Sequence, residues 1–208
     1  GPGSVVVLKH WSQIPGQTVP GWYQINQEIF GENFFDAIGT SVDISNDGSV
    51  IAIGSEAFNE NQGQVNIYKD FGDGLWTQIG SSMNGENIGD KAGTVSLSND
   101  GSTVVIGASS ADSIYENSGH ARIFKFQNSQ GNTISLTNIH SIEGTTTSDS
   151  LVSTNSNEFI NGYGGKDTVV LTGLFKDYSI SRENDLLTMD DLRTSVGTGY
   201  DWLRNIEY

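Results

Sequence analysis

Cysteine is absent from the 208 residues, proline occurs only three times, and basic side chains are few. The lack of cysteine excludes a thiol nucleophile, a disulfide framework and a cysteine-rich zinc site. Ten Lys and Arg side chains stand against 25 Asp and Glu side chains, which gives a formal net charge of −15. This charge repels phosphate backbones and anionic lipid surfaces, so nucleic acid is excluded as a partner. No apolar run approaches the ~20 residues of a membrane-spanning helix, so no membrane insertion is expected.

Apolar residues make up 35% of the chain, below the roughly 45–50% that is usual for soluble domains. Four Trp, seven Tyr and nine Phe nevertheless indicate an ordered protein. We therefore expect thin packed layers and not one thick core. Residues 1–4 resemble the scar that a tag-removing protease leaves, so we expect the natural protein to be longer.

Two stretches of the chain repeat each other. Trp-Tyr-Gln-Ile at Trp22 returns 54 positions later as Trp-Thr-Gln-Ile at Trp76, and both copies continue into Ser-Asn-Asp-Gly-Ser at 45–49 and 98–102. Apolar and polar residues alternate within each copy, which is typical of strands with one buried face. The Asn-Asp-Gly sequences suit tight hairpin turns. Each copy is thus predicted to form about four strands, and no helix is clearly signalled.

These residues resemble the bacterial FG-GAP-like β-propeller repeats, whose blades read roughly G-x-S-V-x-L-S-x-D-G-S-x-x-A-I-G-A, then G-x-V-x-I-Y, then W-x-Q-I-G. The pattern fits residues 39–55, 63–68 and 76–80, and it fits again at 93–108. The resemblance covers about residues 5–127 and implies stacked four-stranded blades.

The number of predicted strands is too small for a closed ring. Residues 5–9 resemble the third strand of a blade, so 5–127 holds two blades and one extra strand. Closed propellers use roughly 4–8 blades. The segment is therefore a piece of a larger ring, an open stack, or a protomer that completes its sheets with other copies. A homo-oligomer that completes the propeller stays open as a partner.

A second repeat follows the linker predicted at 128–141. Its acidic and apolar positions each recur every nine residues, with the apolar residue two positions after the acidic one: Asp149, Glu158 and Asp167, then Leu151, Ile160 and Val169. Two residue classes thus share one period.

The three turns resemble the RTX nonapeptide G-G-x-G-x-D-x-U-x of the parallel β-roll, a calcium-binding repeat. The turn at 162–170 is the best copy and departs in having Tyr163 at the second position. Residues 199–207 are similar to the G-T-D-x-L-x-N-I-E sequence of the segment that follows RTX repeats and caps the roll. The resemblance covers 142–208 and implies a secreted or cell-surface protein with type I-like export. The expected fold class is all-β, with stacked four-stranded propeller-like blades of an incomplete propeller, a short parallel β-roll and a β cap.

The roll predicts one Ca²⁺ site. Two nonapeptides make one coil, so Asp149 and Asp167 share an edge, whereas Glu158 falls on the opposite edge without a stacked partner. Calcium prefers 6–8 oxygen ligands. We expect carboxylate ligands from Asp149 and Asp167 and carbonyl ligands from Gly162 and Gly164, with loop glycines at positive φ. The alternative is that the two eroded turns have lost calcium and form only a short coil.

Other acidic residues are interpreted as structural. Asp47 and Asp100 each stand alone after Asn, which favours turn formation over calcium binding. Asp190, Asp191 and Asp201 are interpreted as solvated carboxylates of the cap, with a second calcium site as the alternative.

The sequence does not indicate an enzyme. The three His residues are scattered, and no Gly-x-Ser-x-Gly elbow or His-Glu-x-x-His zinc helix is present. Acid pairs such as Glu32 with Asp36 recur in both repeats, which favours a structural role. The recurring Trp22 and Trp76 are expected in the core between sheets. Exposed loop aromatics are the candidate ligand contacts: Phe34, Phe35, Phe58 and Tyr115.

These observations together predict a calcium-stabilised extracellular interaction or adhesion module of a larger secreted RTX-type bacterial protein. Its partner would be an extracellular protein or carbohydrate. Two alternatives stay open: a non-catalytic C-terminal appendage of an exported hydrolase, and a self-assembling structural unit.

Overall fold

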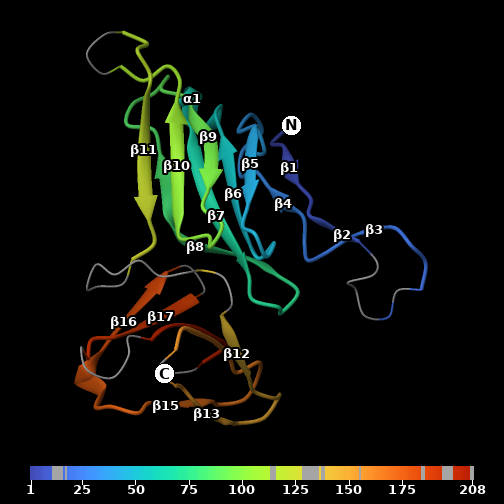
Figure 1. Ribbon diagram of the computed structural model, residues 1–208, viewed down its shortest axis with the longest axis vertical. Helices are drawn as coiled ribbons and strands as arrows, with labels where there is room; N and C mark the ends of the chain where they lie inside the picture. The colour runs from blue at the N-terminus through green and yellow to red at the C-terminus, as the bar shows by residue number, and fades with distance from the viewer. Residues whose placement is uncertain are drawn as a thin grey trace. The chain divides into compact units, whose positions relative to one another are not determined.

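The computed structural model describes residues 1–10, 16, 18–112, 116–127, 136, 139–154, 156–183, 186–193 and 199–206. The described chain is all-β apart from two short helical segments, as the sequence predicts (Figure 1). It divides into two compact units, Gly1–Phe124 and Lys125–Tyr208. Among the described residues, no helix is long and apolar enough to cross a membrane.

The centre of the first unit is a four-stranded antiparallel sheet, here called blade 1. Its strands lie in the order β5 (Ser41–Ile44), β6 (Val50–Ser55), β7 (Gln64–Asp70) and β8 (Trp76–Asn84). Each sheet face collects every second side chain, so Val42, Ile53 and Asn66 lie in one row. Because all four predicted strands are present in this sheet, blade 1 is the complete copy of the repeat.

Blade 2 repeats the first three of these strands, in the order β11 (His120–Lys125), β10 (Thr103–Ala108) and β9 (Ala92–Leu97). It stacks directly on blade 1. The Val95 backbone N–H donates to the Ser41 hydroxyl at 3.1 Å, and the Leu97 N–H donates to the Asp43 carboxylate at 2.7 Å.

Four short strands before blade 1 form a half-blade. β1 (Ser4–Val5) pairs with β4 (Ile29–Phe30), and β2 (Leu8–His10) pairs with β3 (Trp22–Gln24). These strands match the third and fourth strands of a blade, so the predicted extra strand is one side of a two-strand layer. The Gly3 carbonyl accepts the N–H of Gly31 as the Gly63 carbonyl accepts that of Gly85, so Gly3 fills the place of the repeat glycine.

The half-blade packs on blade 1 through a shared apolar cluster. Its centre is Ile29, Ile38, Ile51, Ile53 and Trp76, and partly buried Val5, Val7, Ile25 and Tyr68 pack against it. The segment α1 (Phe58–Asn61) follows β6 and carries positive φ at 59–61, so it is a left-handed turn.

The second unit begins with a parallel coil. β12 (His140–Glu143) pairs with β14 (Glu158–Asn161), and β13 (Ser150–Val152) pairs with β15 (Thr168–Val170). Partner residues are eighteen positions apart, so two nine-residue turns make one coil, as the sequence predicts. β12 starts at His140, within the segment predicted as a linker.

The cap completes a five-stranded sheet in the order β12-β14-β18-β17-β16. It contains the 3-10 turn η2 (Phe175–Asp177) and the strands β16 (Tyr178–Glu183), β17 (Leu186–Asp191) and β18 (Tyr200–Arg204). β18 lies parallel beside β14, with Phe159 opposite Trp202. The core between the layers is Leu151, Ile160, Leu187, Met189 and Leu203.

Candidate metal centre

Asp149 and Asp167 lie together on one edge of the coil. The parallel pairing of β13 and β15 stacks them, and the Asp149 N–H donates to Asp167 Oδ1 at 2.9 Å. Asp149 Oδ2 accepts the N–H and the hydroxyl of Thr145 at 2.7 and 2.9 Å. Within the described chain, no ion pair joins either of these two carboxylates to a basic side chain.

One buried oxygen of this pair accepts no hydrogen bond from the residues that the structure describes. Asp167 is only 4% exposed, and its Oδ2 atom is buried without a hydrogen bond among the described residues. A buried carboxylate oxygen without a partner is costly, because it loses its hydration and receives nothing in exchange. A cation at this point would supply the missing contact.

Glycine is required beside this oxygen because of close approach. A Cβ atom at Gly162 would lie 2.2 Å from Asp167 Oδ2 and 2.5 Å from the Asn205 carbonyl oxygen. The expectation that positive φ explains the loop glycines is wrong for Gly144, Gly162 and Gly164. Positive φ occurs instead at Gly165 and at Tyr163, the residue that departs from the nonapeptide pattern.

The Gly162 carbonyl oxygen belongs to the same cluster. A Cβ at Gly144 would lie 2.9 Å from this oxygen and 3.1 Å from Asp149 Oδ2, so both oxygens converge on Gly144. The Gly164 N–H donates to the carbonyls of Gly162 and Thr145 at 3.0 and 3.2 Å. In the described part of the chain, no three His, Cys, Asp or Glu side chains gather as a metal cluster. A cation here would therefore depend on backbone carbonyls as well as on the two carboxylates.

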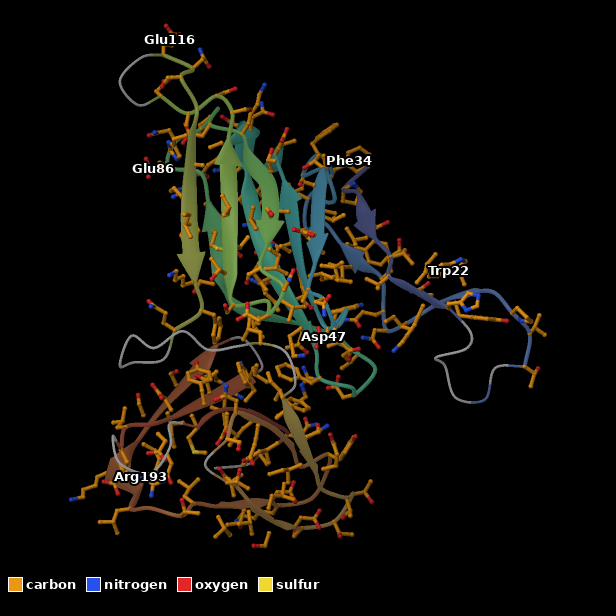
Figure 2. The ribbon with its side chains drawn as sticks, in the orientation of Figure 1. Trp22, Phe34, Asp47, Glu86, Glu116 and Arg193 are labelled. Atoms are coloured by element: carbon orange, nitrogen blue, oxygen red, sulfur yellow. The ribbon has the colours of Figure 1, made fainter. Side chains whose placement is uncertain are left out.

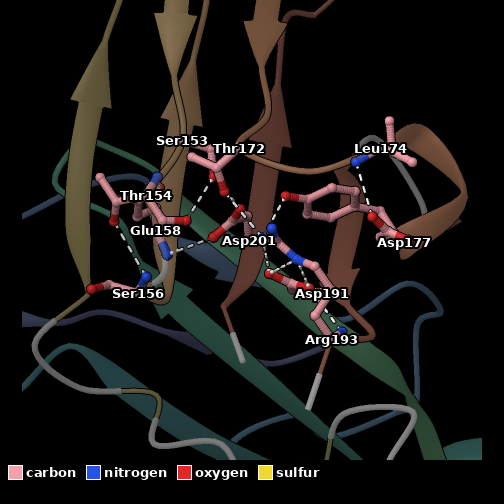
Figure 3. Close-up of polar contacts among 11 residues, drawn as sticks. Ser153, Thr154, Ser156, Glu158, Thr172, Leu174, Asp177, Asp191, Arg193 and Asp201 are labelled. Carbon is pink, nitrogen blue, oxygen red and sulfur yellow. Dashed lines mark hydrogen bonds and ion pairs between the residues drawn. The ribbon is translucent and has the colours of Figure 1, made fainter. Parts of the chain in front are cut away.

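The opposite edge of the coil repeats this arrangement with Glu158 and Asp201. The Glu158 N–H donates to Asp201 Oδ1 at 3.1 Å, and Glu158 accepts the N–H of Thr154 at 2.9 Å and its hydroxyl (Figure 3). The prediction that Glu158 has no stacked partner is wrong, because β18 enters the sheet beside β14 and supplies one.

The two edges differ in how the second acid is satisfied. Asp201 Oδ2 accepts the Ser153 hydroxyl at 3.0 Å. Burial raises the pKa of Asp201 to about 7, and the neighbouring charges of Glu158 and Asp191 act in the same direction, against the hydrogen bonds from Ser153 and Glu158. A proton can therefore occupy this edge near neutral pH.

The cap acids are buried and not solvated, which corrects the sequence interpretation. Asp190, Asp191 and Asp201 are each at most 4% exposed. Arg193 pairs with Asp191, with Nε 2.8 Å from Oδ1, and this hydrogen bond lowers the pKa of Asp191 (Figure 3). Cap residues fold inward because β17 and β18 lie in the middle of the five-stranded sheet.

An apolar cavity of about 420 Å³ adjoins the candidate metal centre. Asp167 and Lys166 lie on its wall together with side chains from both layers of the second unit, among them Leu171, Ile180 and Met189. An apolar wall lowers the local dielectric, which strengthens any contact between a cation and a carboxylate.

The Asn-Asp-Gly turns have the structural role that the sequence predicts. Asp100 Oδ1 accepts the Ser98 hydroxyl at 2.6 Å and the Ser102 N–H at 3.1 Å, and these bonds lower the pKa of Asp100. Asp47 makes the same contacts with Ser45 and Ser49. Each carboxylate closes its own hairpin.

The recurring acid of each loop before a blade is also a turn residue. Asp36 accepts the Asn33 N–H at 2.7 Å and Asp90 accepts the Asn87 N–H at 2.8 Å, and both acids are buried. This arrangement agrees with the structural reading of the acid pairs.

Phe34, labelled in Figure 2, and its neighbour Phe35 lie at the tip of one such loop. Their side chains are 66% and 77% exposed. Their rings meet edge to face at 5.0 Å between centroids. With Asn33, Asp36 and the left-handed turn at 57–61 they line a hollow of about 570 Å³. Phe58 is half-buried and is not among the residues that line this hollow. Tyr115, also a candidate contact, lies outside the described residues.

The recurring tryptophans differ in burial. Trp76 is 4% exposed and belongs to the core, as predicted, whereas Trp22 is 69% exposed (Figure 2). The core prediction for Trp22 is wrong because no further layer of the described chain covers its side of the half-blade.

Comparison with known proteins gives little further information. No family model matches the chain, and no curated protein matches it. Among solved structures, the crystal structure of TolB from Acinetobacter baumannii is similar over 96% of this chain and 43% of that chain, at 14% sequence identity and a TM-score of 0.27. The chain thus spans less than half the length of that structure.

Proposed function

We propose that this chain is a calcium-stabilised extracellular interaction module of a larger secreted RTX-type protein. The observation that carries the calcium part is the buried Asp167 Oδ2, which has no hydrogen-bond partner in the described chain and faces Gly162 beside the stacked Asp149. The function is binding and not catalysis.

The donor set suits a hard divalent cation. Asp149 and Asp167 would supply carboxylate oxygens, and the carbonyls of Gly162 and Gly164 would complete the set with water. Ca²⁺ accepts such mixed oxygen ligands in flexible geometry. Bound calcium would supply positive charge that neutralises the stacked carboxylates.

The expected affinity links the module to the outside of the cell. A site with only two carboxylates belongs to the weaker class of calcium sites, with dissociation constants of about 10⁻⁴–10⁻³ M, as in extracellular modules. Such a site would be filled outside the cell and empty in the cytosol, so the coil would gain stability on export.

The recognition surface in this proposal is the hollow at Phe34 and Phe35, and its ligand is a neutral carbohydrate. The wall combines two exposed aromatic rings with amide and carboxylate groups from Asn33, Asn59 and Glu60, and none of the lining residues is basic. Aromatic faces pack on the apolar faces of sugars, while amides bond hydroxyl groups. An acidic ligand would meet only like charge here.

The loop tip differs between the repeats, which supports a specific role. Gly31-Glu-Asn-Phe-Phe-Asp36 corresponds to Gly85-Glu-Asn-Ile-Gly-Asp90. The buried acid and its turn are retained, whereas the two aromatics occur in one copy only. Three successive non-glycine residues at positive φ, 59–61, form the facing wall, and such strained backbone is often kept at binding sites.

Thermal unfolding with calcium and with chelator tests the metal proposal. At a calcium concentration about 100 times the dissociation constant, the second unit should gain roughly 2.7 kcal/mol, and titration calorimetry should detect the binding directly. Asp167→Asn keeps the hydrogen bond to Asp149 but removes the charge, so it should abolish both signals. Asp47→Asn is the matched control and should retain both. An unfolding transition that calcium leaves unchanged in the unsubstituted chain would refute the proposal.

Binding to a panel of neutral chito-, cello- and galacto-oligosaccharides tests the recognition surface. Phe35→Ala should lose at least tenfold in affinity for any oligosaccharide bound, because it removes an exposed ring and no buried contact. Ile88→Ala, at the position of Phe34 in the other copy, should leave affinity unchanged. Retained affinity in the Phe35 variant would show that the sugar binds elsewhere.

A further inference from the structure

Blade 2 exposes a face that the same repeat buries in blade 1. Ala52 and Ile67 lie on the blade 1 face that blade 2 covers, and they are 0% and 9% exposed. The corresponding residues of blade 2, Val105 and Ile123, are 38% and 67% exposed. Both positions carry apolar residues in both blades. The difference in exposure therefore arises because blade 2 covers this face of blade 1, whereas no layer of the described first unit covers it in blade 2. We call this face of blade 2, with Val105, Ala121 and Ile123, the trailing face.

The half-blade exposes the complementary face. Trp76 and Tyr68 lie on the blade 1 face that the half-blade covers. Their counterparts, Trp22 and Leu8, are exposed on the outer side of the half-blade. Four exposed apolar side chains lie on this side, which we call the leading face: Val6, Leu8, Trp22 and Phe30. The strand register places Leu8, Trp22 and Phe30, and Val6 joins them because its neighbours Val5 and Val7 pack on the core cluster.

The two open faces are the two halves of a contact that the chain already makes twice. The half-blade stacks on blade 1, and blade 1 stacks on blade 2. In each contact, the face that corresponds to the trailing face of blade 2 packs on the face that corresponds to the leading face of the half-blade. We propose that a second copy of this chain continues the series, with its leading face on the trailing face of blade 2.

The charge distribution favours a second copy at these faces. The chain has 25 acidic side chains, yet neither face row contains one. The leading row is Ser4, Val6, Leu8, His10, Trp22, Gln24 and Phe30, and the trailing row includes Thr94, Ser96, Thr103, Val105, Ala121 and Ile123. Two copies can therefore meet here without placing carboxylates against each other, although each carries a net charge of −15.

The contact is head-to-tail because the two faces differ. Such contacts produce a ring when the rotation between copies closes and an open filament when it does not. The inference does not depend on the proposed calcium site, since its residues all lie in the first unit.

Sedimentation velocity with light scattering tests the contact across a wide concentration range. The unsubstituted chain should associate in a concentration-dependent way, and more strongly at higher salt, because salt screens the net charge. Ile123→Asp, on the trailing face, and Leu8→Asp, on the leading face, should each be monomeric. Both side chains are exposed, so the variants should fold, which circular dichroism checks. Val105→Asp and Trp22→Ser serve as second variants for each face.

Mixing the two face variants distinguishes head-to-tail stacking from a symmetric contact. An equimolar mixture of Ile123→Asp and Leu8→Asp retains one intact face on each partner, so it should form a dimer and nothing larger. Ile88→Asp, on an exposed loop, should assemble like the unsubstituted chain. A chain that stays monomeric at every concentration, or one in which only one of the two face variants dissociates, would overturn the proposal.

Discussion

The two edges of the coil hold their acidic residues with the same hydrogen-bond pattern, but the second acid has different partners on each edge. On each edge a Thr hydroxyl and N–H bind the first acid, and the N–H of that acid binds the second. On one edge the second acid, Asp167, has an oxygen beside Gly162 without a hydrogen-bond partner in the described chain. On the other edge Asp201 takes the Ser153 hydroxyl and holds a proton up to about pH 7.

This difference shows that stacked acids alone do not define a metal site. The neighbouring residues decide whether a pair of stacked carboxylates needs a bound cation or is satisfied by hydrogen bonds and a proton of the protein itself. Where a carboxylate oxygen lies against glycine backbone and no hydrogen bond of the described chain completes it, a cation would supply the missing contact. Where a hydroxyl already donates a hydrogen bond to the carboxyl oxygen and burial favours the neutral acid, protonation removes the charge and no cation is needed.

The largest expected effect comes from adding a side chain at Gly162, where the backbone lies against Asp167. Gly162→Ala places a methyl group within 2.5 Å of the Asn205 carbonyl oxygen, which is backbone and cannot rotate away. We expect the second unit to lose about 3 kcal/mol, the upper range for overpacking, as measured by urea unfolding. Gly164→Ala is the control, because its nearest neighbour would be 3.8 Å away, and it should change stability by less than about 0.5 kcal/mol.

A pair of isosteric substitutions should separate the two edges. Asp149→Asn is expected to remove the calcium-dependent gain of roughly 2.7 kcal/mol, whereas Glu158→Gln should keep it. Calorimetric titration with CaCl₂ provides the measurement. Equal losses in both variants would mean that the two edges bind the metal together.

The proton at Asp201 predicts an unusual pH dependence. The folded pKa of Asp201 lies above the ordinary aspartate value of 3.8. The folded state therefore binds the proton more tightly, and stability falls as pH rises from about 4 to about 7. In chelator, the second unit should lose about 2 kcal/mol between pH 5 and pH 8. Asp201→Asn should flatten this dependence by removing the titrating group. A slope that persists in the variant would assign the effect to another carboxyl.

The smallest effects are expected from removing the Thr hydroxyl on each edge, which tests whether the two hydrogen-bond patterns are equally stabilising. Thr145→Val and Thr154→Val each remove one hydroxyl that donates to the first acid of an edge. Each should cost about 1 kcal/mol, the usual net value of such a hydrogen bond, in equilibrium unfolding with chelator present. Thr154→Val should cost more, because Glu158 is fully buried and Asp149 is not.

Local patterns in the sequence predicted much of the fold. The nine-residue period of Asp149, Glu158 and Asp167 gave the eighteen-residue register of the coil, because each apolar residue two positions later must point to the same core. The Ser-Asn-Asp-Gly-Ser turns gave both hairpins, since their contacts are confined to five residues.

Non-local pairing explains what the sequence analysis missed. Asp201 reaches Glu158 only because β18 inserts beside β14, which brings together two residues that are 43 positions apart. One signal was present: Asp201 and Leu203 repeat the acid-x-apolar spacing of the coil, outside its nine-residue frame. The core prediction for Trp22 is wrong for a related reason. Burial of this side chain requires a second sheet packed on its face, which the pattern of its own strand does not reveal.

The placement of the tryptophans gives each unit its own optical reporter. Trp76 lies in the core of the first unit and Trp202, 1% exposed, lies in the core of the second. Indole emission shifts to longer wavelength when water reaches the ring. In a chain with Trp11 and Trp22 changed to Phe, Trp76→Phe would leave Trp202 to report the melting of the second unit, and Trp202→Phe would leave Trp76 to report that of the first. The response to calcium can then be assigned to one half of the molecule.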